Sequence, residues 1–133
     1  MEIYIIRHAE SANNASPLES RVEDPTLSPV GYDQADFLAG RLRHIKPERI
    51  LVSPFRRTLE TLAPYLNSTE VVPEAWIDIH EQGGVVRGHE DGRYVGCPGM
   101  RRSEILQEYP EMALPEEIDE HGWWKSKPFE TVA

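Results

Sequence analysis

Short apolar runs alternate along this chain with polar segments that carry helix-start signals, and this alternation constrains the fold more than any other feature. Ser28 precedes Pro29, and Ser53 precedes Pro54. A serine side chain accepts hydrogen bonds from the first free N–H groups of a helix, and proline is favoured at the first helical position. After Pro29, apolar residues recur at helical spacing, at Ala35, Leu38, Leu42 and Ile45. The pattern predicts a helix after each pair, with one face buried.

Three apolar segments predict strands: residues 2–6, residues 50–52 and residues 71–79. Within the last segment, the extended run is expected to be entered after Pro73. The first two are short runs rich in β-branched residues, which is typical of buried strands. Residues 83–99 contain six glycines and read as a loop, and a short helix is expected before Pro110. Strands that alternate with helices predict an open α/β sheet.

The size and charge of the chain limit the classes of protein it can belong to. Its 133 residues suit a single domain, residues 1–133. The formal net charge of -9 argues against binding to nucleic acid or an anionic membrane, both of which need basic surfaces. The single cysteine, Cys97, excludes an internal disulfide and is typical of a reducing compartment. No apolar run approaches the roughly 20 residues of a membrane span. We expect a cytoplasmic protein.

Polar residues follow the first two predicted strands, in residues 7–11 and residues 53–58. In an open parallel sheet, ligands bind beyond the carboxyl ends of the strands. The second segment also opens a helix, whose free N–H groups favour an anion. A pocket that combines a histidine, arginines and a helix N-terminus is suited to phosphate.

Four motifs in order resemble the histidine phosphatase (phosphoglycerate mutase-like) superfamily, on its phosphatase branch. They are residues 7–11 with Asn14, residues 27–31 with Gln34 and Ala35, residues 53–55 with Arg57 and Thr61, and residues 79–83. Further residues between 99 and 124 are similar to the variable part of that branch. The resemblance implies a three-layer α/β/α fold with a mostly parallel central sheet.

The resemblance also implies roles for five residues. His8 would be the nucleophile, since a neutral imidazole can attack phosphorus at physiological pH. Arg7 and Arg57 would bind the phosphoryl oxygens through the transition state, and Asn14 would donate a further hydrogen bond. Glu81 would protonate the leaving oxygen and then deprotonate water, which needs a raised pKa. The chemistry requires no metal, and no cofactor is expected.

Alternatives remain open for several of these positions. Glu74 and Glu90 are rivals of Glu81 as the acid, and Arg56 is interpreted as a surface neighbour of Arg57. Arg101 and Arg102 could bind a substrate carboxylate or second phosphate, or could simply begin a solvated helix. The histidines at positions 80, 89 and 121, taken with Cys97, lack the spacing of zinc ligands.

One family feature has no counterpart in the sequence. The family has a second active-site histidine in a His-Gly motif on a central strand. His121-Gly122 is the only His-Gly pair here, and it lies in a polar stretch rather than after an apolar strand. We therefore expect an incomplete domain that lacks the C-terminal strand and helices of the family.

The leading hypothesis is a phosphatase that hydrolyses a small phosphomonoester through a phosphohistidine at His8, with the activity of this incomplete chain left open. The alternatives are a phosphotransferase of the phosphoglycerate mutase type and a regulatory module that binds phosphate without turnover. The expected partner is a small phosphorylated substrate. Its identity and the oligomeric state of the chain are left open.

Overall fold

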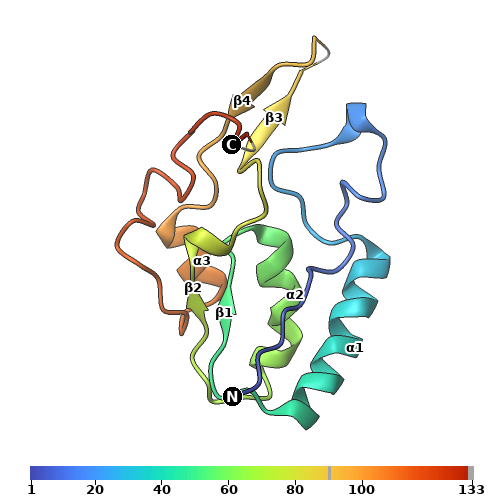
Figure 1. Cartoon of the computed structure of the whole chain (residues 1–133), viewed down its shortest axis with the longest axis vertical. Coiled ribbons are helices and arrows are strands. Elements are labelled where there is room, and N and C mark those ends of the chain that lie inside the picture. Colours follow the sequence, from blue (N-terminus) through green and yellow to red (C-terminus); the bar gives the residue numbers. More distant parts are fainter. Residues whose placement is uncertain (90, 132–133) are drawn as a thin grey trace.

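The computed structural model describes residues 1–89 and 91–131 of the chain (Figure 1). Its elements follow one another as η1 (Leu18–Ser20), α1 (Pro29–Ile45), β1 (Leu51–Val52), α2 (Arg56–Leu66), β2 (Glu74–Ala75), η2 (Ile77–Ile79), β3 (Val86–Gly88), β4 (Tyr94–Gly96) and α3 (Arg102–Glu108), where η marks a short 3-10 helix. Helices alternate with the parallel strands β1 and β2. The α/β class expected from the sequence is confirmed.

The first helix, α1, begins where the sequence predicts. The Ser28 hydroxyl accepts a 3.0 Å hydrogen bond from the N–H of Gly31, and Pro29 is the first helical residue. The helix ends at Lys46, whose left-handed backbone (φ 53°) lets its N–H donate to the carbonyl of Leu42 at 2.8 Å. The buried residues form one face, Gly31, Ala35, Ala39 and Leu42.

The second helix, α2, packs against α1 and starts later than expected. Phe55 precedes its first residue, Arg56, and the Ser53 hydroxyl accepts a 3.4 Å hydrogen bond from the N–H of Phe55 instead of capping the helix. The Ser53-Pro54 pair therefore turns the chain out of β1 before the helix begins. The buried face of α2 consists of Leu59, Thr61, Leu62 and Tyr65.

The strands β1 and β2 pair in parallel, with Leu51 opposite Glu74 and Val52 opposite Ala75. The other edge of β2 bridges to Ala113, whose carbonyl accepts a 2.9 Å hydrogen bond from Ala75. The predicted strand over residues 71–79 is thus much shorter than expected, because the chain turns into η2 directly after Trp76.

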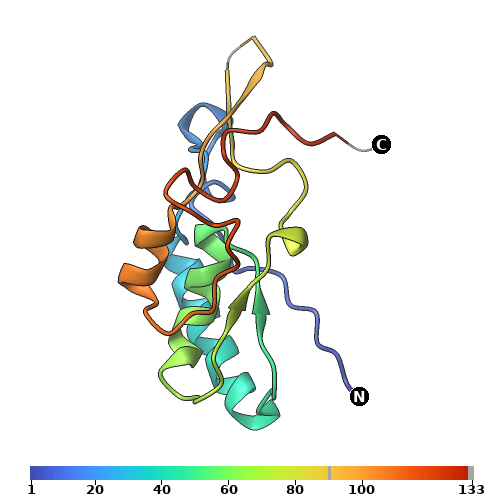
Figure 2. The ribbon, with the colours of Figure 1, turned by 90° about the vertical axis from the view of Figure 1, so that its left-hand side faces the viewer.

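The expectation of a buried strand over residues 2–6 is wrong. Ile3 and Ile5 are 72% and 95% exposed. The segment makes no β-ladder among the described residues, and the N-terminal end stands away from the helices (Figure 2). A β-branched run forms a strand only where a neighbouring strand offers hydrogen bonds, and no described element lies alongside it to do so.

The glycine-rich segment predicted as a loop contains an antiparallel hairpin. The strands β3 and β4 pair with Val86 opposite Gly96 and Gly88 opposite Tyr94. Gly92 lies in the turn with a φ of 81°, a conformation that favours glycine. The hairpin extends from one end of the molecule (Figure 1).

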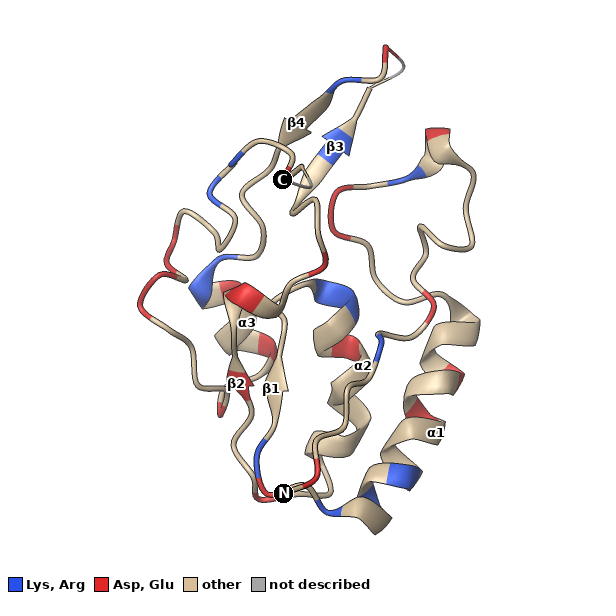
Figure 3. Ribbon diagram, in the orientation of Figure 1, with Lys and Arg blue, Asp and Glu red and all other residues tan. Residues whose placement is uncertain are grey.

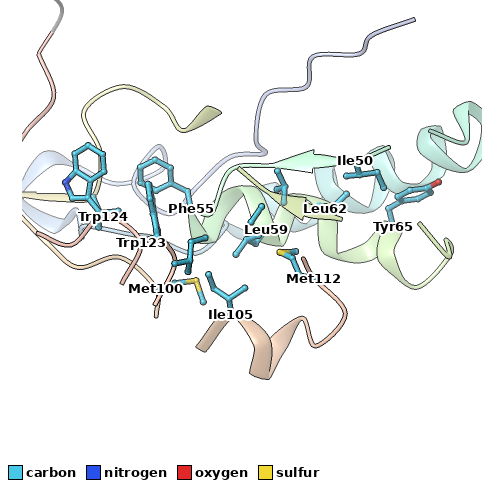
Figure 4. Close-up of a cluster of buried hydrophobic side chains, with 14 of the residues drawn as sticks. Ile50, Phe55, Leu59, Leu62, Tyr65, Met100, Ile105, Met112, Trp123 and Trp124 are labelled. Carbon is cyan, nitrogen blue, oxygen red and sulfur yellow. The ribbon is translucent and has the colours of Figure 1, made fainter. Parts of the chain in front are cut away.

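The main hydrophobic core lies between α2 and the irregular chain that surrounds α3 (Figure 4). Leu59 from α2, Ile105 from α3 and Trp123 from the following loop are all almost fully buried. A smaller cluster joins Ala9 to Leu27 and to Ala35 of α1. This small cluster anchors the start of the chain immediately after His8.

Acidic and basic residues are spread along the whole ribbon, and basic residues lie at the start of α2 (Figure 3). No helix in the described part of the chain is both long enough and apolar enough to cross a membrane.

Candidate active site

His8 lies in the irregular segment that follows the exposed N-terminal run. Its side chain is only 8% exposed, and its Nδ1 atom lies 2.6 Å from the carbonyl oxygen of Ala9. A carbonyl only accepts hydrogen bonds, so Nδ1 must carry the hydrogen for this contact to form. In the neutral ring, the lone pair is then on Nε2.

Arg57 lies in the first turn of α2, with its guanidinium group 3.9 Å from the centre of the Phe55 ring. The Arg57 side chain is 12% exposed, and its Nη2 atom donates a 2.7 Å hydrogen bond to Oε2 of Glu81. Stacking on an aromatic face restrains the planar guanidinium group and keeps its hydrogens directed outward from the ring.

Glu81 completes a cluster with His8 and Arg57. The same Oε2 atom that binds Arg57 lies 3.4 Å from Nε2 of His8. Glu81 follows η2, a short turn that carries the chain from β2 toward the start of α2. The structure therefore brings together the predicted nucleophile, one predicted phosphate-binding arginine and the predicted acid.

The pKa of Glu81 is lowered from its ordinary value. Partial burial acts to raise this pKa, but the hydrogen bond and the charge of Arg57, with smaller contributions from His8, outweigh burial. The sequence-based expectation of a raised pKa is therefore wrong for this arrangement. The pKa is lowered because the direct contact with Arg57 stabilises the carboxylate form of Glu81.

Thr61 connects the His8 segment to α2. The N–H of Ala9 donates a 2.9 Å hydrogen bond to the Thr61 hydroxyl, which in turn donates at 2.6 Å to the carbonyl of Arg57. Thr61 is buried. The sequence places Thr61 in the third motif but assigns it no role.

Among the described residues, no hydrogen bond or ion pair joins the side chain of Arg7 or of Asn14 to this cluster. Arg7 is exposed. The amide oxygen of Asn14 accepts hydrogen bonds from the N–H and the hydroxyl of Ser11, at 3.0 and 2.9 Å. Their assignment to phosphate binding stays a prediction.

The rival acids are placed differently. Glu74 forms a two-pronged ion pair with Arg49 at the start of β2, with atoms 2.8 and 3.0 Å apart. Glu90 lies outside the described residues. Arg56 contacts Glu108 at 3.4 Å rather than Glu81. Its interpretation as a surface neighbour of Arg57 stays a prediction.

Asp24 was not predicted from the sequence. Its Oδ1 accepts a 3.0 Å hydrogen bond from the N–H of Arg56 at the start of α2. Burial raises the pKa of Asp24 to about 6, against opposing effects of Arg56 and Arg57. The contact spans 32 residues, so no local sequence signal could have revealed it.

Glu60 lies on α2 and is half-buried. Its carboxylate accepts a 2.7 Å hydrogen bond from the N–H of Leu27 and a 3.2 Å bond from Tyr32. The carboxylate therefore holds the loop before α1 against α2.

A cleft of about 960 Å³ lies beside the site, lined by Asp24, Arg56 and residues from the 97–126 region. His121 lies on its wall, and neither His8 nor Glu81 does.

Two other residues near this region, Arg101 and Arg102, have structural contacts. Arg101 pairs with Glu104 in the first turn of α3, and Arg102 donates to the carbonyls of Pro115 and Ile118.

Among residues 1–89 and 91–131, no group of three or more His, Cys, Asp and Glu side chains is arranged to hold a metal ion. The absence of a metal and of a cofactor stays an expectation from the sequence.

The fold and the site together define a class: an α/β protein that sets a histidine, an arginine and a carboxylate against one another beside the N-terminus of a helix. Residues 3–130 match the histidine phosphatase superfamily (branch 1), and the chain belongs to this family.

Curated relatives carry phosphatase names. A probable phosphatase of Schizosaccharomyces pombe is 33% identical over 79 residues, which cover 59% of this chain and 38% of the relative. Phosphoserine phosphatase 1 of Hydrogenobacter thermophilus is 28% identical over 111 residues, covering 84% of this chain and 48% of the relative. Phosphohistidine phosphatase SixA of Escherichia coli is 37% identical over 82 residues, which cover 56% of this chain and 48% of the relative. The chain thus matches about half the length of these relatives or less.

Two solved structures are similar at low identity. A mycobacterial hydrolase has a TM-score of 0.47 and 22% identity, and the match covers 77% of this chain and 45% of that one. A mycobacterial glucosyl-3-phosphoglycerate phosphatase has a TM-score of 0.49 and 23% identity, and the match covers 77% of this chain and 44% of that one.

Proposed function

We propose that this site hydrolyses a small phosphomonoester in two steps, through a phosphohistidine at His8. The observation that carries the proposal is the contact of one carboxylate oxygen of Glu81 with both Arg57, at 2.7 Å, and Nε2 of His8, at 3.4 Å. A nucleophile, a cation that binds phosphoryl oxygens and a proton carrier are the three groups that this reaction requires.

In the first step, the Nε2 lone pair of His8 attacks phosphorus, and the bond from phosphorus to the alcohol oxygen breaks. The departing oxygen takes a proton from Glu81. In the second step, a water oxygen attacks the phosphohistidine and gives a proton back to Glu81. The phosphorus–nitrogen bond breaks, and inorganic phosphate and neutral His8 result. Arg57 stabilises the charge on the phosphoryl oxygens in both steps.

Substrate binding would also prepare Glu81 to act as an acid. A phosphoryl group competes with Glu81 for the guanidinium hydrogens of Arg57. When Arg57 turns to the phosphoryl oxygens, the contact that lowers the pKa of Glu81 is lost, while partial burial still acts to raise it. Arg7 and Asn14 would join the bound phosphoryl group as further donors.

The region after Glu81 supports hydrolysis over transfer to a second phosphorylated compound. A mutase needs free cations there to hold its substrate. Arg87 forms an ion pair with Glu23 at 2.8 Å, and Arg93 forms one with Asp91. The names of the relatives concern phosphoserine, which is a phosphomonoester, and phosphohistidine, which is a phosphoramidate. The proposal therefore names the phosphomonoester class and no single compound.

Two substrates that differ in leaving group test this function. Phosphoserine releases a poor leaving group that must be protonated, whereas p-nitrophenyl phosphate releases a stable anion. Glu81→Gln should lower kcat/KM for phosphoserine by on the order of 100-fold and change p-nitrophenyl phosphate hydrolysis far less. Glu74→Gln is the matched control and should affect neither reaction.

An equal loss on both substrates in Glu81→Gln would contradict the role of Glu81 as the acid. A chain that becomes stably phosphorylated on His8 without releasing phosphate would instead support a regulatory module.

A further inference from the structure

We propose that His80, held by Glu130, is a positioning residue that keeps Glu81 against His8 and Arg57. This inference rests on the proposed function, because it assigns a purpose to the placement of the proposed acid. His80 directly precedes Glu81 in the chain, and its side chain is 11% exposed. Its contacts account for how one exposed loop carboxylate is held in a fixed place.

Both ring nitrogens of His80 face acceptor oxygens. Nδ1 lies 2.6 Å from the carbonyl of Ile77, and Nε2 lies 2.9 Å from a carboxylate oxygen of Glu130. The ring can donate to both only when each nitrogen carries a hydrogen. The first contact fixes the ring to η2, and the second fixes it to the C-terminal part of the described chain.

Aromatic side chains enclose the rest of the His80 ring. Its centroid lies 5.2 Å from that of Trp124, 5.7 Å from Trp123 and 6.5 Å from Phe55. These three side chains lie next to one another in the core, and Trp123 packs edge-on against Phe55 at 4.9 Å (Figure 4). His80 is therefore restrained on its faces as well as at its nitrogens.

Phe55 joins this enclosure to the active site. The ring that lies near His80 also lies under the guanidinium group of Arg57, at 3.9 Å. Arg57 binds Glu81, and Glu81 is the next residue after His80. The contacts thus form a closed loop of Arg57, Phe55, His80 and Glu81, and a shift of His80 would be passed to the carboxylate.

Glu130 is held in place by its own segment. Its N–H donates a 3.2 Å hydrogen bond to the carbonyl of Gly83, two residues beyond Glu81. The ring of Phe129 packs against Gly83, where a Cβ atom would lie 3.0 Å from the ring, and stacks on Tyr94 at 4.9 Å. The segment therefore crosses the loop that carries Glu81 and holds it from the outside.

The test uses variants that should fold. Glu130→Gln keeps the size of an exposed side chain but removes its charge, and His80→Phe keeps the aromatic packing but removes both hydrogen bonds. Each should lower kcat/KM for phosphoserine by roughly ten- to a hundredfold, as expected when a catalytic group is displaced by about 1 Å. Hydrolysis of p-nitrophenyl phosphate should change little. Glu111→Gln, which removes another exposed carboxylate, is the control for charge.

A second measurement needs no turnover. Nitrogen–hydrogen correlation NMR of the histidine rings should show that Glu130→Gln shifts the signals of His80 and, through Glu81, those of His8. The signals of His44 should not move. Unchanged His8 signals, or equal loss on both substrates, would overturn the positioning role. If the wild-type chain hydrolyses neither substrate, the proposed function fails, and the His8 signals still decide whether His80 and Glu130 position Glu81.

Discussion

The backbone N–H of Ala9 donates a 2.9 Å hydrogen bond to the hydroxyl of Thr61, 52 residues further along the chain. The same hydroxyl donates at 2.6 Å to the carbonyl of Arg57. A single oxygen atom thus sets the segment that carries His8 against the helical turn that carries Arg57. Since residues 2–6 form no strand, this contact is a main restraint on the position of His8.

Replacing Thr61 by valine should therefore damage both stability and turnover. The N–H of Ala9 would lose its acceptor in a buried place, at a cost of about 1–3 kcal/mol in the free energy of unfolding. Urea unfolding and kcat/KM for p-nitrophenyl phosphate measure the two effects. Thr61→Ser retains the hydroxyl and should lose much less of either. A loss in Thr61→Ser as large as that in Thr61→Val would contradict the role of the hydrogen bond, because only Thr61→Ser keeps the hydroxyl.

The two arginines at the start of α2 should differ sharply. Arg57 binds Glu81 at 2.7 Å, whereas Arg56 contacts Glu108 at 3.4 Å. Arg57→Ala should raise the activation free energy by about 2.7–4 kcal/mol, by analogy with the loss of one preorganised oxyanion donor. Arg56→Ala should have a much smaller effect on kcat/KM. A larger loss in Arg56→Ala would mean that the third motif is aligned one residue out of register.

Asp24 should make the folded state less stable as pH rises from about 4 to about 6. Burial raises its pKa from the ordinary value of 3.8 to about 6, and its Oδ2 atom is buried without a hydrogen-bond partner among the described residues. Between these two pH values, the folded chain binds more protons than the unfolded chain, so the free energy of unfolding falls. A difference of about two pKa units corresponds to roughly 3 kcal/mol as an upper bound.

Asp24→Asn should remove most of this dependence, because the amide stays neutral while its oxygen still accepts from Arg56. Urea unfolding at pH 4.5 and pH 7.5 should show the variant to be more stable than the wild type at the higher pH only. The exposed Asp36→Asn serves as the control. Parallel pH curves for Asp24→Asn and the wild type would rule out this origin of the pH dependence.

Local signals in the sequence predicted the helices well. The Ser28-Pro29 pair and the apolar spacing that follows it located α1, because capping and amphipathic spacing depend on residues close together in the chain. The run over residues 2–6 has an equally strong local pattern, but the strand that it predicts does not form. A strand depends on a partner from elsewhere in the structure, and composition alone does not supply one.

The candidate site likewise contains residues that sequence motifs predicted and residues that no local signal revealed. Motifs located His8, Arg57 and Glu81, which the structure brings together. They also named Arg7 and Asn14, whose side chains form no hydrogen bond or ion pair with that cluster among the described residues. Asp24, Thr61 and Glu130 escaped prediction as contacts of the site region because each acts over dozens of residues. The lowered pKa of Glu81 could not be foreseen either, since it depends on the direct contact with Arg57.

Trapping the phosphorylated enzyme tests the role of His8 most directly. The purified chain should be mixed with a ³²P-labelled phosphomonoester and quenched within the first turnover, and the labelled residue should be located by mass spectrometry. We predict an acid-labile, base-stable phosphoryl group on His8 that is lost in His8→Ala and retained in His121→Ala. Label that persists in His8→Ala, or that lies on any other residue, would contradict a phosphohistidine at His8.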